Sequence, residues 1–103
     1  MWKTYGAVSA AKAALEAHIR QLAVELAPAG ITANAIQAGV TDTPALRKIP
    51  GNERMIAHAA AANPSGRLTT PADIAATLVA FTLPHAQWMT GNVIRVDGAE
   101  DIV

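Results

Sequence analysis

The chain has 103 residues, of which 51% are hydrophobic and 4% aromatic, and its 8 basic and 8 acidic side chains give no net charge. This length allows one small domain, and the charge balance provides no electrostatic footprint for nucleic acid or an anionic membrane surface. Cysteine is absent, which excludes disulfides and thiolate metal sites. The sequence has no secretory signal and no apolar run of the ~18–20 residues that span a bilayer, so we expect a cytoplasmic protein without membrane or nucleic-acid partners.

A long helix is predicted from Gly6 to Ala27, because no Pro or Gly interrupts it and good helix formers dominate. One apolar stripe at helical spacing comprises Val8, Ala11, Leu15, Ile19, Leu22 and Leu26. A second face carries small residues and one valine: Ala10, Ala13, Ala14, Ala17 and Val24. A helix that is apolar over most of its circumference is normally covered on two sides. Pro28 and Gly30 are expected to end it.

The middle of the chain alternates extended and helical patterns. Residues 31–36 predict a short buried strand, and residues 37–44 a loop leaving its carboxyl end. Residues 45–62 form a mixed segment, broken by Pro50-Gly51, with a helix expected from Asn52 to Ala62. Residues 63–66 predict another loop.

The last third begins with a helix-start signal. Thr70 can cap the helix, Pro71 suits its first position, and Asp73 faces its positive end. The helix should run to about Leu83, before Pro84, and residues 92–96 should form the final strand.

Strands that alternate with helices predict an α/β fold with a parallel sheet. Two strands are too few to bury both faces of such a sheet, and no strand precedes the first helix. The two strands and three to four helices expected here therefore form an incomplete α/β organisation.

Tyr5 and Lys12 are the sharpest chemical feature. Seven residues make almost two helical turns, so both positions face one side, about 10 Å apart along the axis. A helical lysine leans toward the N-terminus, and an ammonium group near a phenol favours the phenolate. Such a tyrosine can donate a proton to substrate, while the lysine binds a sugar hydroxyl. On spacing alone, a structural tyrosine and a solvated lysine are the commoner interpretation.

Sequence context changes this interpretation. The stretch Tyr5-Gly-Ala-Val-Ser-Ala-Ala-Lys12, followed by Gly30-Ile-Thr-Ala-Asn-Ala-Ile36, resembles the catalytic helix and next strand of the short-chain dehydrogenase/reductases. Thr90-Gly-Asn-Val-Ile-Arg-Val-Asp-Gly98 resembles the last strand of that family. The resemblance covers essentially the whole chain. It implies a Rossmann-like fold that lacks its N-terminal strands, with residues 1–103 as the C-terminal segment of a single domain that contains the catalytic helix, substrate loop and last strands.

Two departures indicate the branch. Most members place the tyrosine four residues before the lysine, where this chain has Val8. The longer spacing from Tyr5 to Lys12 resembles the enoyl-acyl-carrier-protein reductases. So does Ala38-Gly39, where the commoner branch has Pro-Gly.

The resemblance also assigns a cofactor site for NADH or NADPH. It comprises Lys12 together with Ala38, Gly39, Thr41 and Thr43. Gly39 lets the backbone approach a flat ring, Thr41 offers backbone hydrogen bonds to the carboxamide, and the Thr43 hydroxyl reaches the pyrophosphate. Ligands of open α/β sheets bind at such carboxyl ends of strands. In the family the residue at the position of Thr41 is usually aliphatic, and this departure leaves a role for its backbone intact. Without the resemblance, a plain glycine-containing turn with a threonine cap would be the favoured interpretation of this segment.

The remaining polar and aromatic candidates are assigned structural roles. His18, His58 and His85 show no metal-ligand spacing, so no metal site is expected. Arg67 is expected to anchor a loop, and Asp97 to cap a turn. Trp88 is expected to pack.

The resulting expectation is an NAD(P)H-dependent oxidoreductase, namely an enoyl-acyl-carrier-protein reductase of fatty acid synthesis. Tyr5 and Lys12 would be catalytic, the substrate an acyl-carrier-protein or CoA thioester, and the enzyme a homo-oligomer through helix 6–27. The segment alone would be inactive, because the glycine-rich phosphate loop and the usual serine or second tyrosine belong upstream of Met1. The alternatives are a 3-ketoacyl or carbonyl reductase of the same superfamily, or a truncated, non-catalytic association module.

Overall fold

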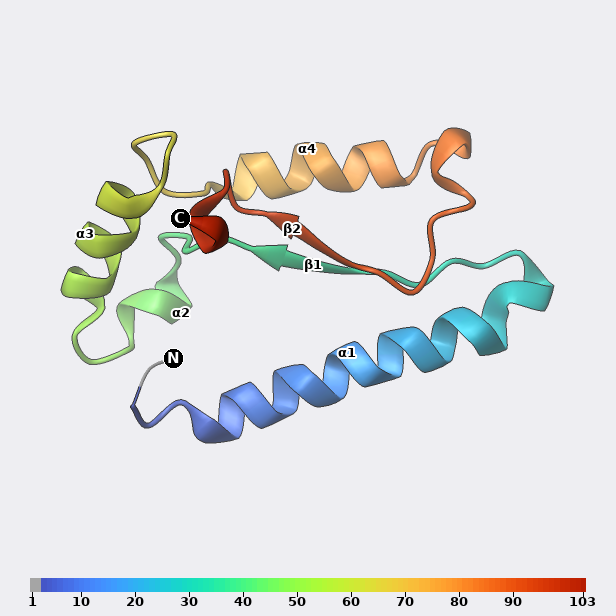
Figure 1. Cartoon of the computed structure of the whole chain (residues 1–103), viewed down its shortest axis with the longest axis horizontal. Helices are drawn as coiled ribbons and strands as arrows, with labels where there is room; N and C mark the ends of the chain where they lie inside the picture. Colours follow the sequence, from blue (N-terminus) through green and yellow to red (C-terminus); the bar gives the residue numbers. More distant parts are fainter. Residues whose placement is uncertain (1–2) are drawn as a thin grey trace. The chain divides into compact units, whose positions relative to one another are not determined.

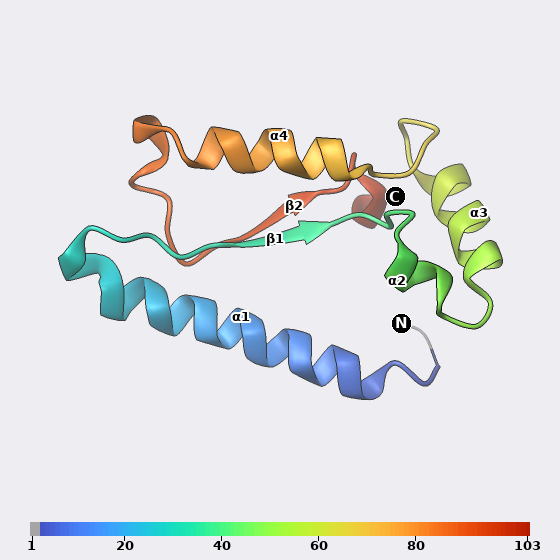
Figure 2. The same ribbon diagram turned by 180° about the vertical axis from the view of Figure 1, so that it is seen from behind.

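The computed structural model describes residues 3–103 and confirms the α/β class. Strands β1 (Ala35–Ala38) and β2 (Val93–Val96) pair side by side in a two-stranded sheet (Figures 1 and 2). The amide of Ala35 donates to the carbonyl of Asn92 at 2.9 Å, and that of Gly39 to the carbonyl of Val96 at 3.1 Å. Both pairs have the same sequence offset, so the strands run parallel.

Along the chain, α1 (Gly6–Leu26) precedes β1. Three further α-helices lie between β1 and β2: α2 (Pro44–Arg47), α3 (Asn52–Ala62) and α4 (Pro71–Phe81). Short 3₁₀ turns follow α1, α4 and β2 at Ala27–Ala29, Pro84–Ala86 and Glu100–Ile102. No helix in the described part of the chain is long and apolar enough to cross a membrane.

The chain divides into two compact units, and both strands pass from one to the other. The first unit comprises the chain up to Ala35 together with Pro84–Ile94, and the second comprises Ile36–Leu83 with Arg95–Val103.

In the first unit, α1 ends at Leu26, one residue before the predicted Ala27. Ala27 begins the 3₁₀ turn, and Gly30 closes it with a left-handed φ of 71° and a hydrogen bond to the Ala27 carbonyl. Ala23 of α1 is buried, and a Cβ added at Gly91 would lie 3.4 Å from the Cβ of Ala23. This would be an ordinary van der Waals contact, so the glycine is explained by its left-handed φ of 77° rather than by close packing.

The predicted strand at residues 31–36 is displaced: β1 starts at Ala35 and includes Gln37 and Ala38, which were expected in the loop. Parallel pairing of the earlier residues would need partners before Asn92, where Gly91 turns with φ 77°. Apart from the bond that the Gly91 amide donates to the Ala33 carbonyl at 2.7 Å, side chains make the contacts there. The Ala33 amide donates to Thr90 Oγ1 at 3.1 Å, and Asn34 Nδ2 donates to the Met89 carbonyl at 2.8 Å.

In the second unit, α3 has its predicted bounds, and Asn63 follows it as a buried anchor. Asn63 Nδ2 donates to the Asp97 carbonyl at 2.8 Å, and Asn63 Oδ1 accepts from the Ser65 amide at 2.8 Å. The loop after α3 is thereby tied to the end of β2.

Helix α4 begins with the predicted cap, completed as a capping box. Thr70 Oγ1 accepts from the Asp73 amide at 3.2 Å, and the Asp73 carboxylate accepts from the Thr70 amide at 2.8 Å. The helix ends at Phe81, short of the predicted Leu83. Pro84 disfavours helical backbone at Leu83, and the Thr82 hydroxyl donates to the Val79 carbonyl.

Little apolar surface is covered. Within residues 3–103 the buried hydrophobic residues are two alanines, Ala23 in the first unit and Ala59 in the second. Leu15 and Leu22 of the predicted α1 stripe are 48% and 40% exposed. The expectation that Trp88 packs is wrong, since it is 97% exposed.

Candidate functional site

Tyr5 and Lys12 are placed by the start of α1. Tyr5 is the N-cap residue, and its carbonyl accepts the first helical hydrogen bond, from the Ser9 amide at 2.9 Å. The helix then runs without interruption past Lys12, so the two residues lie almost two turns apart on one side, with Val8 between them. The helical spacing that the sequence predicts is therefore present.

Both side chains have unused polar groups. Tyr5 is 41% exposed and Lys12 is also exposed. Within residues 3–103, the ion pairs are made by Arg47, Arg67 and Arg95, and Lys12 takes part in none. The phenol and ammonium can therefore bind groups from outside the described chain.

The backbone before Tyr5 is unusual. Thr4 has a φ of 72°, a left-handed conformation that is costly for a β-branched residue. This conformation directs the chain into α1 immediately ahead of the tyrosine.

The second group of predicted site residues lies where β1 ends. Ala38 is the last residue of the strand rather than part of the loop, and Gly39 makes the last ladder hydrogen bond. Thr41 Oγ1 donates to the Gly39 carbonyl at 2.8 Å, and Thr41 forms an isolated parallel bridge with Thr69. The Gly39–Thr43 loop is thus an ordered turn at the carboxyl end of the sheet.

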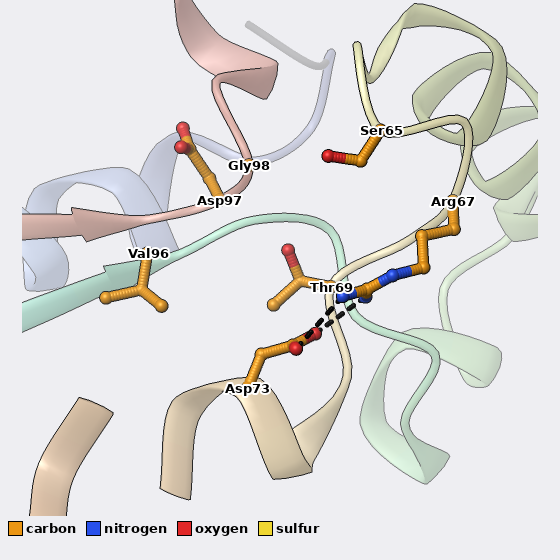
Figure 3. A pocket seen from close by; sticks show the side chains of 7 residues that line it. All are labelled: Ser65, Arg67, Thr69, Asp73, Val96, Asp97 and Gly98. Atoms are coloured by element: carbon orange, nitrogen blue, oxygen red, sulfur yellow. Dashed lines mark hydrogen bonds and ion pairs between the residues drawn. The ribbon is translucent and has the colours of Figure 1, made fainter. Parts of the chain in front are cut away.

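Gly39 is required by close packing within the chain. A Cβ there would lie 2.9 Å from Glu100 Oε2 and 3.0 Å from Asp97 Cβ, and still closer to Thr69 Oγ1. Thr69, just before α4, and Asp97, just after β2, are both buried (Figure 3). The expected role of Gly39, approach to a flat ring, is joined by an internal one that the sequence did not indicate.

Thr43 has a structural role that leaves a functional one open. Its hydroxyl oxygen accepts from the Leu46 amide at 3.2 Å and caps α2. The hydroxyl proton of Thr43 remains available to a phosphate oxygen, because an alcohol both accepts and donates. This donor fits the predicted contact with a pyrophosphate.

An ion pair that the sequence analysis missed braces the same loop. Arg47 Nε and Nη2 donate to the Asp42 carboxylate at 2.8 and 2.6 Å. This fork lowers the pKa of Asp42 and raises that of Arg47. It joins the loop to α2 between Thr41 and Thr43.

Arg67 anchors a loop, as predicted. Its guanidinium donates to both Asp73 oxygens, at 2.7 and 3.0 Å (Figure 3). It also donates to the Leu68 carbonyl at 2.8 Å. The hydrogen bonds from Arg67, and then those from Thr70, hold the pKa of Asp73 well below its usual range. This pair borders a cavity of about 230 Å³ that Thr69 and Asp97 also line.

Asp97 caps a turn, also as predicted. Its Oδ1 accepts from the Ala99 amide at 3.0 Å and its Oδ2 from the Asp101 amide at 3.2 Å. The turn carries Glu100 to the Gly39–Thr43 loop, where both carboxylate oxygens accept from the Val40 amide at 3.2 and 3.1 Å. Glu100 was not singled out from the sequence, because nothing in its local pattern signals a partner sixty residues away.

The predicted site residues thus form two local groups. Tyr5 and Lys12 belong to the first unit, whereas Gly39, Thr41 and Thr43 belong to the second. The three histidines contribute to neither, and within residues 3–103 no three His, Asp or Glu side chains gather into a possible metal site.

Comparison with known proteins gives a consistent family. Residues 1–99 match the family model described as enoyl-(acyl carrier protein) reductase. The chain is 39% identical to the short-chain reductase protein NovJ of Streptomyces niveus, over 85% of this chain and 36% of that protein. It is 36% identical to the NADH-dependent enoyl-[acyl-carrier-protein] reductase FabI of Aquifex aeolicus, over 96% of this chain and 37% of that protein.

Solved structures agree. The enoyl-acyl carrier protein reductase of Bacillus cereus, solved with NADP+ and an indole naphthyridinone, is similar with a TM-score of 0.93 and 31% identity, over 100% of this chain and 40% of that one. The 3-ketoacyl-(acyl-carrier-protein) reductase of Brucella melitensis, solved with NADH, has a TM-score of 0.76 and 31% identity, over 90% and 36%. The chain spans little more than a third of the length of the curated relatives it matches. It belongs to the enoyl-(acyl-carrier-protein) reductase family of the short-chain dehydrogenase/reductases.

Proposed function

We propose that this chain is the C-terminal part of an NAD(P)H-dependent reductase that reduces the C=C bond of an enoyl thioester carried by acyl carrier protein or CoA. The observation that carries this proposal is the pairing of Tyr5 with Lys12 across two turns of α1. The Bacillus cereus enoyl reductase also matches this fold more closely than the 3-ketoacyl reductase does, with TM-scores of 0.93 and 0.76.

Tyr5 and Lys12 have one role each in this reduction. When bound, the reduced cofactor supplies a hydride to the β-carbon of the conjugated thioester, and the electron pair of the C=C bond moves toward the carbonyl oxygen as an enolate. Tyr5 donates its phenolic proton to this enolate. Lys12, a cation on the same side of the helix, stabilises the phenolate that remains.

The residues expected to hold the cofactor have suitable free groups. Lys12 has donors for a ribose hydroxyl, and the Thr43 hydroxyl retains a proton for a phosphate oxygen. The Gly39–Thr43 loop leaves the carboxyl end of β1, where ligands of parallel sheets bind. We propose Ala38, Gly39, Thr41 and Thr43 as the nicotinamide end of that site.

A second candidate is reduction of a 3-ketoacyl thioester. Its support is the similarity to the Brucella melitensis enzyme at 31% identity. The same tyrosine would then donate a proton to an alkoxide formed at a ketone. Tyr5 lies three residues earlier than Val8, and this difference of about one turn favours the enoyl substrate.

We also propose that α1 associates with a second copy of the chain. Both of its apolar faces are exposed: Leu15 and Leu22 on the first are 48% and 40% exposed, and Val24 on the second, the face of Ala17, is 73% exposed. An apolar face of this kind gains free energy when it is covered, and homo-oligomers most often do so across a two-fold axis.

The deciding experiment compares substrates in the whole reductase that carries this segment. Crotonyl and acetoacetyl thioesters are assayed side by side with NADH and with NADPH. We expect a higher kcat/KM for the crotonyl thioester. Preference for acetoacetyl would move the protein to the second candidate, and turnover of neither would favour a non-catalytic association module.

A further inference from the structure

We propose that Glu100 is a positioning residue that fixes the Gly39–Thr43 loop for cofactor binding. Its carboxylate accepts a bifurcated hydrogen bond from the Val40 amide, at 3.2 and 3.1 Å. The Val40 amide belongs to the Gly39–Val40 peptide, so this bond orients that peptide, whose carbonyl accepts from Thr41 Oγ1 at 2.8 Å. The inference rests on the proposed function, because it assigns the loop to the cofactor.

The turn that presents Glu100 is built for this contact. Asp97, which is buried, accepts the Ala99 and Asp101 amides with its carboxylate and the Glu100 amide with its carbonyl, at 3.2 Å. Three hydrogen bonds to one residue therefore hold the 3₁₀ turn Glu100–Ile102 in place. The position of Glu100 does not depend on its own side chain.

Backbone strain supports the same conclusion. Ala99 has a φ of 71°, the left-handed region that alanine seldom occupies. Strain of this kind persists where the surroundings impose it, and it concentrates at functional sites. Here it turns the chain so that the next residue, Glu100, reaches Val40.

The loop is shaped to receive the carboxylate. A side chain at Gly39 would meet Glu100 Oε2 at 2.9 Å, so the missing Cβ leaves room for it. Glu100 is partly buried in this position, whereas its neighbour Asp101 is exposed and pairs with Arg95 at 3.0 Å. Two adjacent acidic residues thus have different partners, which provides a matched control.

The test uses three variants: Glu100→Ala removes the acceptor, Glu100→Gln keeps an acceptor of the same length, and Asp101→Ala removes the neighbouring carboxylate. Exchange of the Val40 amide is measured by NMR on the chain, with the Gly91 amide, bonded to the Ala33 carbonyl at 2.7 Å, as internal reference. We expect exchange at Val40 to accelerate about tenfold in Glu100→Ala, the factor that corresponds to one ordinary hydrogen bond. Glu100→Gln and Asp101→Ala should stay close to wild type.

The second measurement is the Kd for NADH and NADPH, by calorimetry, in the whole reductase. Glu100→Ala should weaken binding about tenfold, and Glu100→Gln should restore it. Unchanged exchange at Val40 in Glu100→Ala would overturn the contact. Faster exchange with an unchanged Kd would overturn the positioning role. A wild-type protein that binds neither cofactor would refute the proposed function, and with it the role of Glu100 toward a cofactor, while the exchange result would still decide the contact.

Discussion

Substitution of Gly39 by alanine tests the packing at the end of β1. The added methyl group would lie 2.9 Å from Glu100 Oε2, 3.0 Å from Asp97 Cβ and closer still to Thr69 Oγ1. Thr69 and Asp97 are 6% and 8% exposed, and each is held by its own backbone segment, so neither can retreat freely. Overpacking of a dense site costs about 1–3 kcal/mol. If Glu100 moves away instead, the Val40 amide loses its acceptor, at a cost of about 1 kcal/mol.

The Gly39→Ala protein should therefore melt at a lower temperature, by about 4–8 °C for each kcal/mol in a unit of this size. Thermal unfolding followed by circular dichroism gives the shift. Gly6→Ala is the matched control, since nothing lies within 4 Å of its added Cβ and alanine is the better helix former. A melting temperature of Gly39→Ala within about 1 °C of wild type would refute the close approach. Thr69→Ala in the Gly39→Ala background should recover part of the loss, because it removes the nearest atom.

Three further predictions concern separate parts of the chain. Tyr5→Phe in the whole reductase should lower turnover of crotonyl thioester about 100-fold or more while the Kd of the cofactor is unchanged; activity within about threefold of wild type would contradict the role of Tyr5 as proton donor. Because the folded-state pKa of Asp73 is depressed, its contribution to stability is present above the unfolded value of about 3.9 and is lost as the pH falls through the folded value. Asp73→Asn should therefore melt lower than wild type at pH 7 and differ less from it at pH 3, and an equal difference at both pH values would count against the Arg67 and Thr70 contacts. Ala17→Glu should weaken self-association in sedimentation, since it places a charge on the exposed small-residue face of α1; a wild-type chain that sediments as a folded monomer would contradict association through this helix.

Local signals explain which elements the sequence predicts. The Thr70-Pro71 start of α4 and the Gly30 stop after α1 are both present, because caps act within one turn. Thr43-Pro44 is the same signal and starts α2, which the sequence analysis left within a mixed segment. That helix was readable from the sequence and was missed.

Non-local contacts explain the errors. The start of β1 is set by the turn at Gly91, nearly sixty residues later, and no pattern within residues 31–36 contains this information. The same holds for Glu100, whose partner Val40 is distant in sequence. Trp88 is another case: its size predicts packing, but nothing within residues 3–103 covers it.

The candidate site depends on the local signals more than on a core. The Tyr5–Lys12 spacing follows from an uninterrupted α1. The Gly39–Thr43 loop is held by a hydrogen bond that Thr41 donates and by bonds that Thr43 and Glu100 accept. Hydrogen bonds fix geometry but contribute only about 0.5–1.5 kcal/mol each, whereas apolar burial supplies most of the stability of a domain. The buried apolar residues within residues 3–103 are two alanines. The geometry of each of the two groups therefore follows from helix caps, spacing and hydrogen bonds, and apolar burial within residues 3–103 contributes little to it.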